Sequence, residues 1–147
     1  MAREDIVRKK MVRDDVSRTL REILVADGRL VLAYLFGSQA TGRAGPRSDV
    51  DVGVLLSGDE ATRRQAHGEL MDALVRRLGT EAIDLVDLRE APIPLRYRVI
   101  RDGQLLHSSD EKARQRFETD TVMRYLDFKP IRDQAFRTAR EAIVGTG

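Results

Sequence analysis

The chain has 147 residues, a length that suits one domain. It contains no cysteine, so disulfide bonds and thiolate metal sites are excluded. The 26 basic and 24 acidic side chains nearly cancel, and the small basic excess neither requires nor excludes a nucleotide or nucleic-acid ligand. No apolar run approaches membrane-spanning length and the N-terminus lacks the apolar core of a secretory signal, so we expect a soluble cytoplasmic protein without membrane contact.

The first part of the chain predicts a helix, a buried strand and a turn. Apolar residues recur at helical spacing over residues 3–26, and Gly28 is a natural stop for this helix. Residues 30–36 are apolar without interruption, which is typical of a strand buried on both faces. Gly37 breaks this strand, and we expect residues 38–41 to begin a short helix.

A second strand, about 48–56, follows a polar loop at 42–47 and carries two carboxylates. Because residues i and i+2 of a strand point to the same face, Asp49 and Asp51 project side by side from an otherwise apolar segment. Two neighbouring carboxylates repel each other, and apolar surroundings raise that cost. The pair therefore favours a bound cation, and hard oxygen ligands suit magnesium.

The remaining chain alternates between helix and strand patterns. Ser57 and Glu60 match a capping box at the start of a helix. The later elements are a helix at 59–78, a strand at 81–88, a short helix at 95–101, a short strand at 103–107, a helix at 109–127, an interruption at Pro130 and a last helix at 131–144.

This order predicts an α/β (α+β) fold in which a small mixed sheet is flanked by helices. We expect a single domain over residues 1–147, with its core at about 28–107 and C-terminal helices at about 109–144. The sequence shows no internal repeat and no linker between domains.

The Gly-Ser turn (Gly37 and Ser38) and the carboxylate pair together suit phosphoryl or nucleotidyl transfer. A glycine at a strand end lets the backbone approach a ligand, and Ser38 can offer its hydroxyl and nearby backbone amides to a phosphate. Asp49 and Asp51 can hold magnesium that bridges phosphate oxygens. A third carboxylate would orient or deprotonate the attacking hydroxyl, and the third strand offers two candidates, Asp84 and Asp87.

These residues resemble the signature of the polymerase β nucleotidyltransferase superfamily: Gly-Ser, ten intervening residues, then Asp49-Val50-Asp51. The strand at 83–88 and the segment at 125–130 narrow the resemblance to the minimal nucleotidyltransferases (MNT) that are antitoxins of HEPN ribonuclease toxins. The resemblance covers nearly the whole chain. It implies a polymerase β-like fold and the transfer of AMP from ATP, with magnesium, onto a tyrosine of the partner toxin, which silences that toxin.

The resemblance also implies roles for single residues. Gly37 and Ser38 would bind the triphosphate, and Asp49 and Asp51 would bind the metal. The third catalytic and metal-binding carboxylate maps best to Asp84. Asp87 lies three residues further on and would face the opposite side of a regular strand, although a bulge would undo that argument.

Two arginines and the C-terminal segment add further expectations. Arg43 and Arg47 lie in the loop before the carboxylate pair, where they either contact nucleotide phosphates or stay solvated. Neither histidine has a metal-ligand partner at useful spacing. A partner-binding role for residues 117–143, in a hetero-oligomer with the toxin, fits the aromatic side chains of Tyr125, Phe128 and Phe136.

Three functions compete. The leading hypothesis is an antitoxin protein adenylyltransferase acting on a cognate HEPN toxin, with ATP as co-substrate and no direct contact with nucleic acid. A non-catalytic antitoxin would instead neutralise its partner by binding and occlusion, with a vestigial nucleotide site. Nucleotidyl transfer to a small molecule or to RNA is the third, but relatives of that kind usually carry a further domain for the acceptor. We therefore expect another protein to supply the acceptor.

Overall fold

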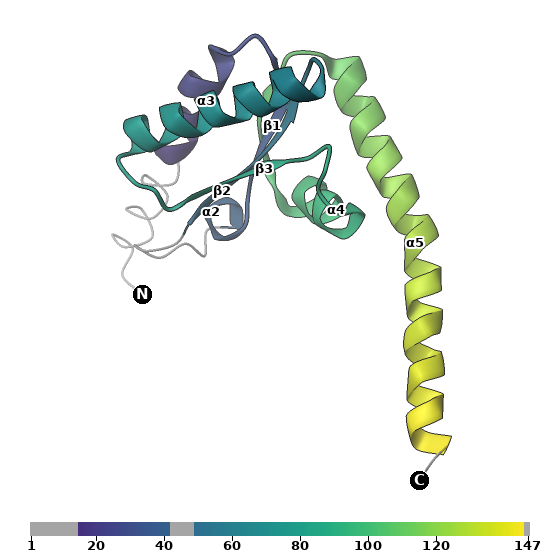
Figure 1. Cartoon of the computed structure of the whole chain (residues 1–147). Coiled ribbons are helices and arrows are strands. Elements are labelled where there is room, and N and C mark those ends of the chain that lie inside the picture. The colour runs from purple at the N-terminus through teal and green to yellow at the C-terminus, as the bar shows by residue number, and fades with distance from the viewer. Residues whose placement is uncertain (1–14, 42–48, 146–147) are drawn as a thin grey trace, which may run out of the picture.

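The computed structural model describes residues 15–41 and 49–145, and it confirms the mixed α/β fold expected from the sequence (Figure 1). Four strands form one sheet in the order β3-β2-β1-β4. Strand β1 pairs antiparallel with β2 and with β4, whereas β2 and β3 are parallel. The strands are β1 (Leu30–Phe36), β2 (Val50–Leu56), β3 (Ile83–Asp87) and β4 (Gln104–Ser108).

Helices cover both faces of the sheet. The N-terminal helix is described over residues 15–25, and the part of its predicted range before residue 15 lies outside the described residues. This helix and α3 cover one face through a shared apolar core, and α4 with the start of α5 covers the other. The remaining helices are α2 (Ser38–Thr41), α3 (Glu60–Leu78), α4 (Ile93–Asp102) and α5 (Glu111–Gly145).

The two central strands are buried on both faces, as their apolar runs predict. In β1 and in β2, every residue except the second is buried. The exception in β2 is Asp51, which is half-buried. A carboxylate therefore occurs in a strand whose other residues all lie in the core, and this position sets the electrostatics of the site described below.

The capping-box prediction at the start of α3 is wrong. The residue that caps α3 is Asp59, whose Oδ1 accepts a hydrogen bond of 2.8 Å from the backbone N–H of Thr62. The Ser57 hydroxyl instead donates to the backbone carbonyl of Arg29, at 3.1 Å. Ser57 thus ties the end of β2 to the start of β1, and the helix begins two residues later than a capping box at Ser57 requires.

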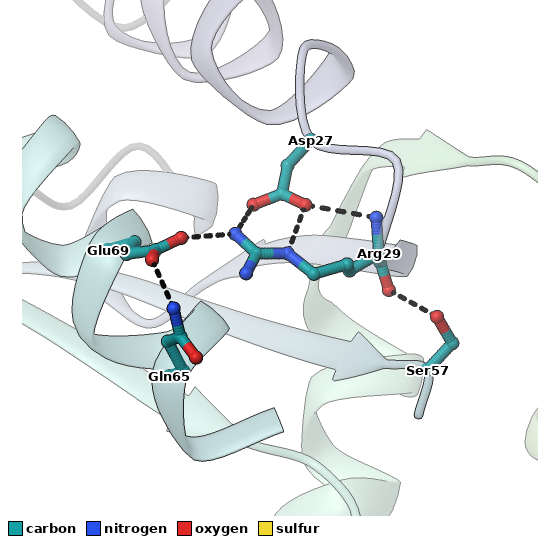
Figure 2. A network of polar contacts seen from close by, with 5 residues as sticks. All are labelled: Asp27, Arg29, Ser57, Gln65 and Glu69. Atoms are coloured by element: carbon teal, nitrogen blue, oxygen red, sulfur yellow. Dashed lines mark hydrogen bonds and ion pairs between the residues drawn. The ribbon is translucent and has the colours of Figure 1, made fainter. Parts of the chain in front are cut away.

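Figure 2 shows the polar network around Arg29 to which Ser57 belongs. The Arg29 guanidinium donates to Asp27 and, at 2.6 Å, to Glu69 of α3, and Glu69 also accepts from Gln65. Arg29 lowers the pKa of the Asp27 carboxyl group, chiefly through this side-chain hydrogen bond. The network fixes the turn between the N-terminal helix and β1 against α3, on the side of the sheet away from the candidate site.

The prediction of two C-terminal helices separated at Pro130 is also wrong, because α5 runs without a break from Glu111 to Gly145. Proline removes one hydrogen bond inside a helix, but its own φ is close to the helical value. Pro130 is exposed, and so is Leu126, whose carbonyl loses its partner. The lost hydrogen bond therefore lies on an exposed stretch of α5, where solvent compensates for it more readily than a packed core would.

Among the residues that the structure describes, the contacts that hold α5 on the domain come from its first half. The Tyr34 hydroxyl of β1 donates to Glu118 at 2.7 Å, and Tyr97 of α4 stacks on Tyr125 with ring centroids 3.8 Å apart. Beyond Tyr125, α5 extends away from the sheet (Figure 1). Within the part of the chain that the structure describes, no helix combines the length and the apolarity needed to cross a bilayer.

Candidate functional site

Strand register brings two of the predicted carboxylates together. Asp51 of β2 pairs with Phe36 at the end of β1 on one side and with Asp84 of β3 on the other. Residues directly opposite each other on neighbouring strands point to the same face of a sheet. Asp51 and Asp84 therefore lie side by side, on the face that α4 covers.

Asp87 lies elsewhere. It pairs with Val54, and its Oδ1 accepts a hydrogen bond of 2.9 Å from the backbone N–H of Arg89 in the turn after β3. Its side chain lines a separate hollow with residues of α3, among them Glu60 and His67. Strand alternation favours Asp84 over Asp87, and the structure places the two side chains accordingly.

The Gly-Ser turn lies against the carboxylate of Asp51. Gly37 has a φ of +70°, in the left-handed region that favours glycine. A Cβ atom added to Gly37 would collide with Oδ2 of Asp51. Ser38 follows as the first residue of α2 and lines the same cavity as Gly37 and Asp51. The absence of a side chain at position 37 thus leaves the space in which Asp51 sits.

The charges of the site concentrate on Asp51. Burial raises the pKa of its carboxyl group, and the negative charges of Asp84 and Asp49 raise it further, while Arg98 partly offsets them. Asp49 is exposed and directly precedes β2. The three carboxylates therefore repel one another around Asp51, and a cation bound there would relieve that repulsion.

Asp51 and Asp84 open into one cavity of about 570 Å³, which Asp49 does not line. One wall comes from α4, which the sequence analysis did not assign to the site. Its three contributors follow one another at intervals of three and four residues, so they share one face of the helix. That spacing groups them on one face but does not tell from the sequence which side of the sheet the face meets. The described residues lining the cavity are Phe36, Gly37, Ser38, Asp51, Asp84, Val86, Leu95, Arg98 and Asp102.

Two loop arginines and a metal ion complete the predicted site. Arg43 and Arg47 lie outside the described residues. Among residues 15–41 and 49–145, no three acidic or histidine side chains stand close enough together to hold a metal ion as they are oriented. The adjacent oxygen donors of Asp51 and Asp84 nevertheless match the ligand chemistry of a hard divalent cation, so the metal assignment stays a prediction.

Comparison with known proteins places this site in a family. The model of the family described as "Polymerase beta, Nucleotidyltransferase" matches residues 18–112, which include Asp49, Asp51, Asp84 and Asp87. The protein adenylyltransferase MntA of Shewanella oneidensis is 31% identical over 116 residues, which are 79% of this chain and 75% of that protein.

Solved structures agree. A toxin–antitoxin structure with AMP-PNP has a chain that superposes with a TM-score of 0.67 at 28% identity, over 84% of this chain and 97% of that one. A complex of tri-AMPylated Shewanella oneidensis HEPN toxin with MNT antitoxin gives a TM-score of 0.59 at 26% identity, over 89% of this chain and 98% of the other. The chain therefore belongs to the polymerase β nucleotidyltransferase family, in the group of minimal nucleotidyltransferases that includes MntA.

Proposed function

We propose that the chain is an antitoxin protein adenylyltransferase, which transfers AMP from ATP to a tyrosine of a cognate HEPN ribonuclease toxin and thereby neutralises it. The observation that carries this proposal is the cavity in which Asp51 and Asp84 lie side by side next to the Gly-Ser turn. The relatives support it, because one is named a protein adenylyltransferase and others are toxin–antitoxin structures with AMP-PNP or with a tri-AMPylated HEPN toxin.

The nucleotide would bind at the Gly-Ser turn. Gly37 lets the backbone come close to a phosphate, and the Ser38 hydroxyl can donate to a phosphate oxygen. In this proposal Arg43 and Arg47 provide further phosphate contacts, for which the arginine side chain is well suited. The α-phosphate would then lie over Asp51 of β2, which is paired with Asp84 of β3.

We assign magnesium to Asp49, Asp51 and Asp84. The donor set consists of carboxylate oxygens, and the mutual repulsion around Asp51 is the kind that a divalent cation relieves. A bound magnesium ion would supply charge neutralisation for the phosphate groups of ATP. Asp51 and Asp84 are suited to binding one ion together because they occupy paired positions on neighbouring strands.

Asp84 is the residue we propose as general base. Its side chain is exposed, so an acceptor hydroxyl can approach it from solvent, and it lies beside Asp51. Asp84 would accept the proton of the tyrosine hydroxyl while the tyrosine oxygen bonds to the α-phosphorus of ATP. The bond between that phosphorus and the oxygen bridging to the β-phosphate breaks, and pyrophosphate leaves with the electron pair.

The toxin that brings the tyrosine needs a surface on this chain, and α5 offers one. Past the Tyr97–Tyr125 stack, α5 extends away from the sheet (Figure 1). Large apolar side chains are exposed there, which suits contact with a protein partner. The exposed fractions of these side chains are 53% for Leu126, 44% for Phe128 and 69% for Phe136.

The decisive experiment combines the full chain with magnesium, ATP labelled on the α-phosphate, and the HEPN protein encoded beside it. We expect the toxin to gain the mass of AMP on a tyrosine, and Asp51→Asn to abolish this gain. Label on a free small molecule in the absence of the toxin would contradict the assignment of the acceptor. Full protection of cells by an inactive Asp51→Asn variant would favour the alternative of neutralisation by occlusion.

A further inference from the structure

We propose that Arg98 of α4 is a substrate-binding residue, whose guanidinium contacts the phosphate groups of the nucleotide. This inference rests on the proposed function and deepens it. Arg98 lines the same cavity as the Gly-Ser turn, Asp51 and Asp84, but it belongs to α4 and not to the strands or the turn. It is the cationic member of the described residues that line this cavity.

The packing of α4 fixes the direction in which Arg98 points. Val99 is fully buried in the core beneath the helix, and Tyr97 stacks on Tyr125 of α5. Arg96 donates to the backbone carbonyl of Ala91, away from the cavity. With these three neighbours engaged elsewhere, the remaining face of α4 carries Arg98 and faces the carboxylates.

The guanidinium of Arg98 is not used by the fold. Within the described part of the chain, neither a hydrogen bond nor an ion pair engages it, although its charge acts on both Asp51 and Asp102. Asp102 pairs instead with Arg101, at 2.8 Å. A planar group with five N–H donors therefore stands at the cavity with its donors available for a ligand.

The charge balance of the site indicates that this ligand is the phosphate chain. A triphosphate entering beside Asp51 and Asp84 brings further negative charge into a cavity that already holds carboxylates. A guanidinium binds phosphate oxygens through paired charge-assisted hydrogen bonds, which are stronger than neutral ones. The acceptor hydroxyl is uncharged and needs no such partner, so the nucleotide is the substrate that Arg98 fits.

Calorimetric titration of the full chain with magnesium and AMP-PNP, in the absence of toxin, tests this directly. We expect Arg98→Ala to weaken binding roughly tenfold to a hundredfold, the loss typical of one hydrogen-bonding partner of a charged group. Arg98→Lys should lose less, because it keeps the charge without the planar fork. Arg64→Ala is the matched control, since Arg64 is an exposed cation on α3, across the sheet, and should bind as the unaltered chain does.

Steady-state kinetics add an independent readout. Arg98→Ala should raise KM for ATP and leave KM for the toxin unchanged. Equal AMP-PNP binding by Arg98→Ala and by the unaltered chain would overturn the inference and leave the proposed function intact, as would a rise confined to the KM for the toxin. Failure of the unaltered chain to bind AMP-PNP would overturn the proposed function, and this role for Arg98 with it.

Discussion

Replacing Gly37 with alanine separates the two reasons for a glycine at this position. The first is conformational, because the φ of +70° is one that residues with a side chain adopt at a cost. The second is spatial, because the new methyl group would collide with Oδ2 of Asp51. The chain supplies a control for the first reason alone: Gly79, at the end of α3, has a φ of +68° and no atom within 4 Å of an added Cβ.

The conformational cost of about 1–2 kcal/mol applies to both variants. For a domain of this size, it lowers the midpoint of thermal unfolding by roughly 3–8 °C. Only Gly37→Ala must also move the Asp51 carboxylate, by an amount on the order of 1 Å. Displacements of that size in a catalytic site cost roughly a hundredfold in rate. We therefore expect comparable destabilisation of the two variants and a loss of AMP transfer in Gly37→Ala alone.

Two measurements check this. Thermal unfolding followed by circular dichroism gives the stability of each variant, and label transfer from ATP to the toxin gives kcat/KM below the unfolding transition. If Gly37→Ala transferred AMP as fast as Gly79→Ala, the space beside Asp51 would have no catalytic meaning, and the placement of the nucleotide at the Gly-Ser turn would be refuted.

Three further predictions follow from the same geometry. Asp84→Asn should lower the rate of AMP transfer at least about a hundredfold, while Asp87→Asn should leave it nearly unchanged. Equal transfer rates for these two variants would contradict the assignment of the general base to Asp84. Because burial and neighbouring charges raise the pKa of Asp51, the metal-free chain should lose stability as pH rises from the usual aspartate pKa through the raised one. Asp51→Asn should therefore raise the midpoint of thermal unfolding at neutral pH and leave it unchanged in acid. A lower midpoint for this variant at neutral pH would contradict the reasoning. Phe136→Ser should weaken toxin binding at least about fivefold in calorimetry with the unfolding midpoint unchanged, and unaltered affinity would exclude this part of α5 from the interface.

Local pattern was sufficient to predict most of the sheet and its carboxylates. The apolar runs of β1 and β2 reflect burial on two faces, and alternation along β3 separates Asp84 from Asp87 because that strand is regular. Arg98 escaped prediction because its position depends on how α4 crosses the sheet, which no local pattern encodes. The capping residue was missed for a related reason: Ser57 makes a tertiary hydrogen bond to Arg29 that the capping box does not anticipate.

The C-terminal helix shows the limit of reading a proline as a stop. Proline costs a helix one hydrogen bond and a clash with the carbonyl four residues earlier, but α5 continues past Pro130, which lies on an exposed stretch where solvent can offset part of that cost. Sequence gives the residue type but not its exposure, and exposure decided the outcome here.

The stack of Tyr97 on Tyr125 has a mechanical consequence. It joins α4, which forms one wall of the cavity, to a helix of 35 residues that is roughly 50 Å long and extends away from the sheet. The two stacked rings are a contact that links this long helix to the wall of the cavity. We therefore expect the binding of a partner to α5 to be transmitted through this aromatic contact to the cavity wall that carries Arg98.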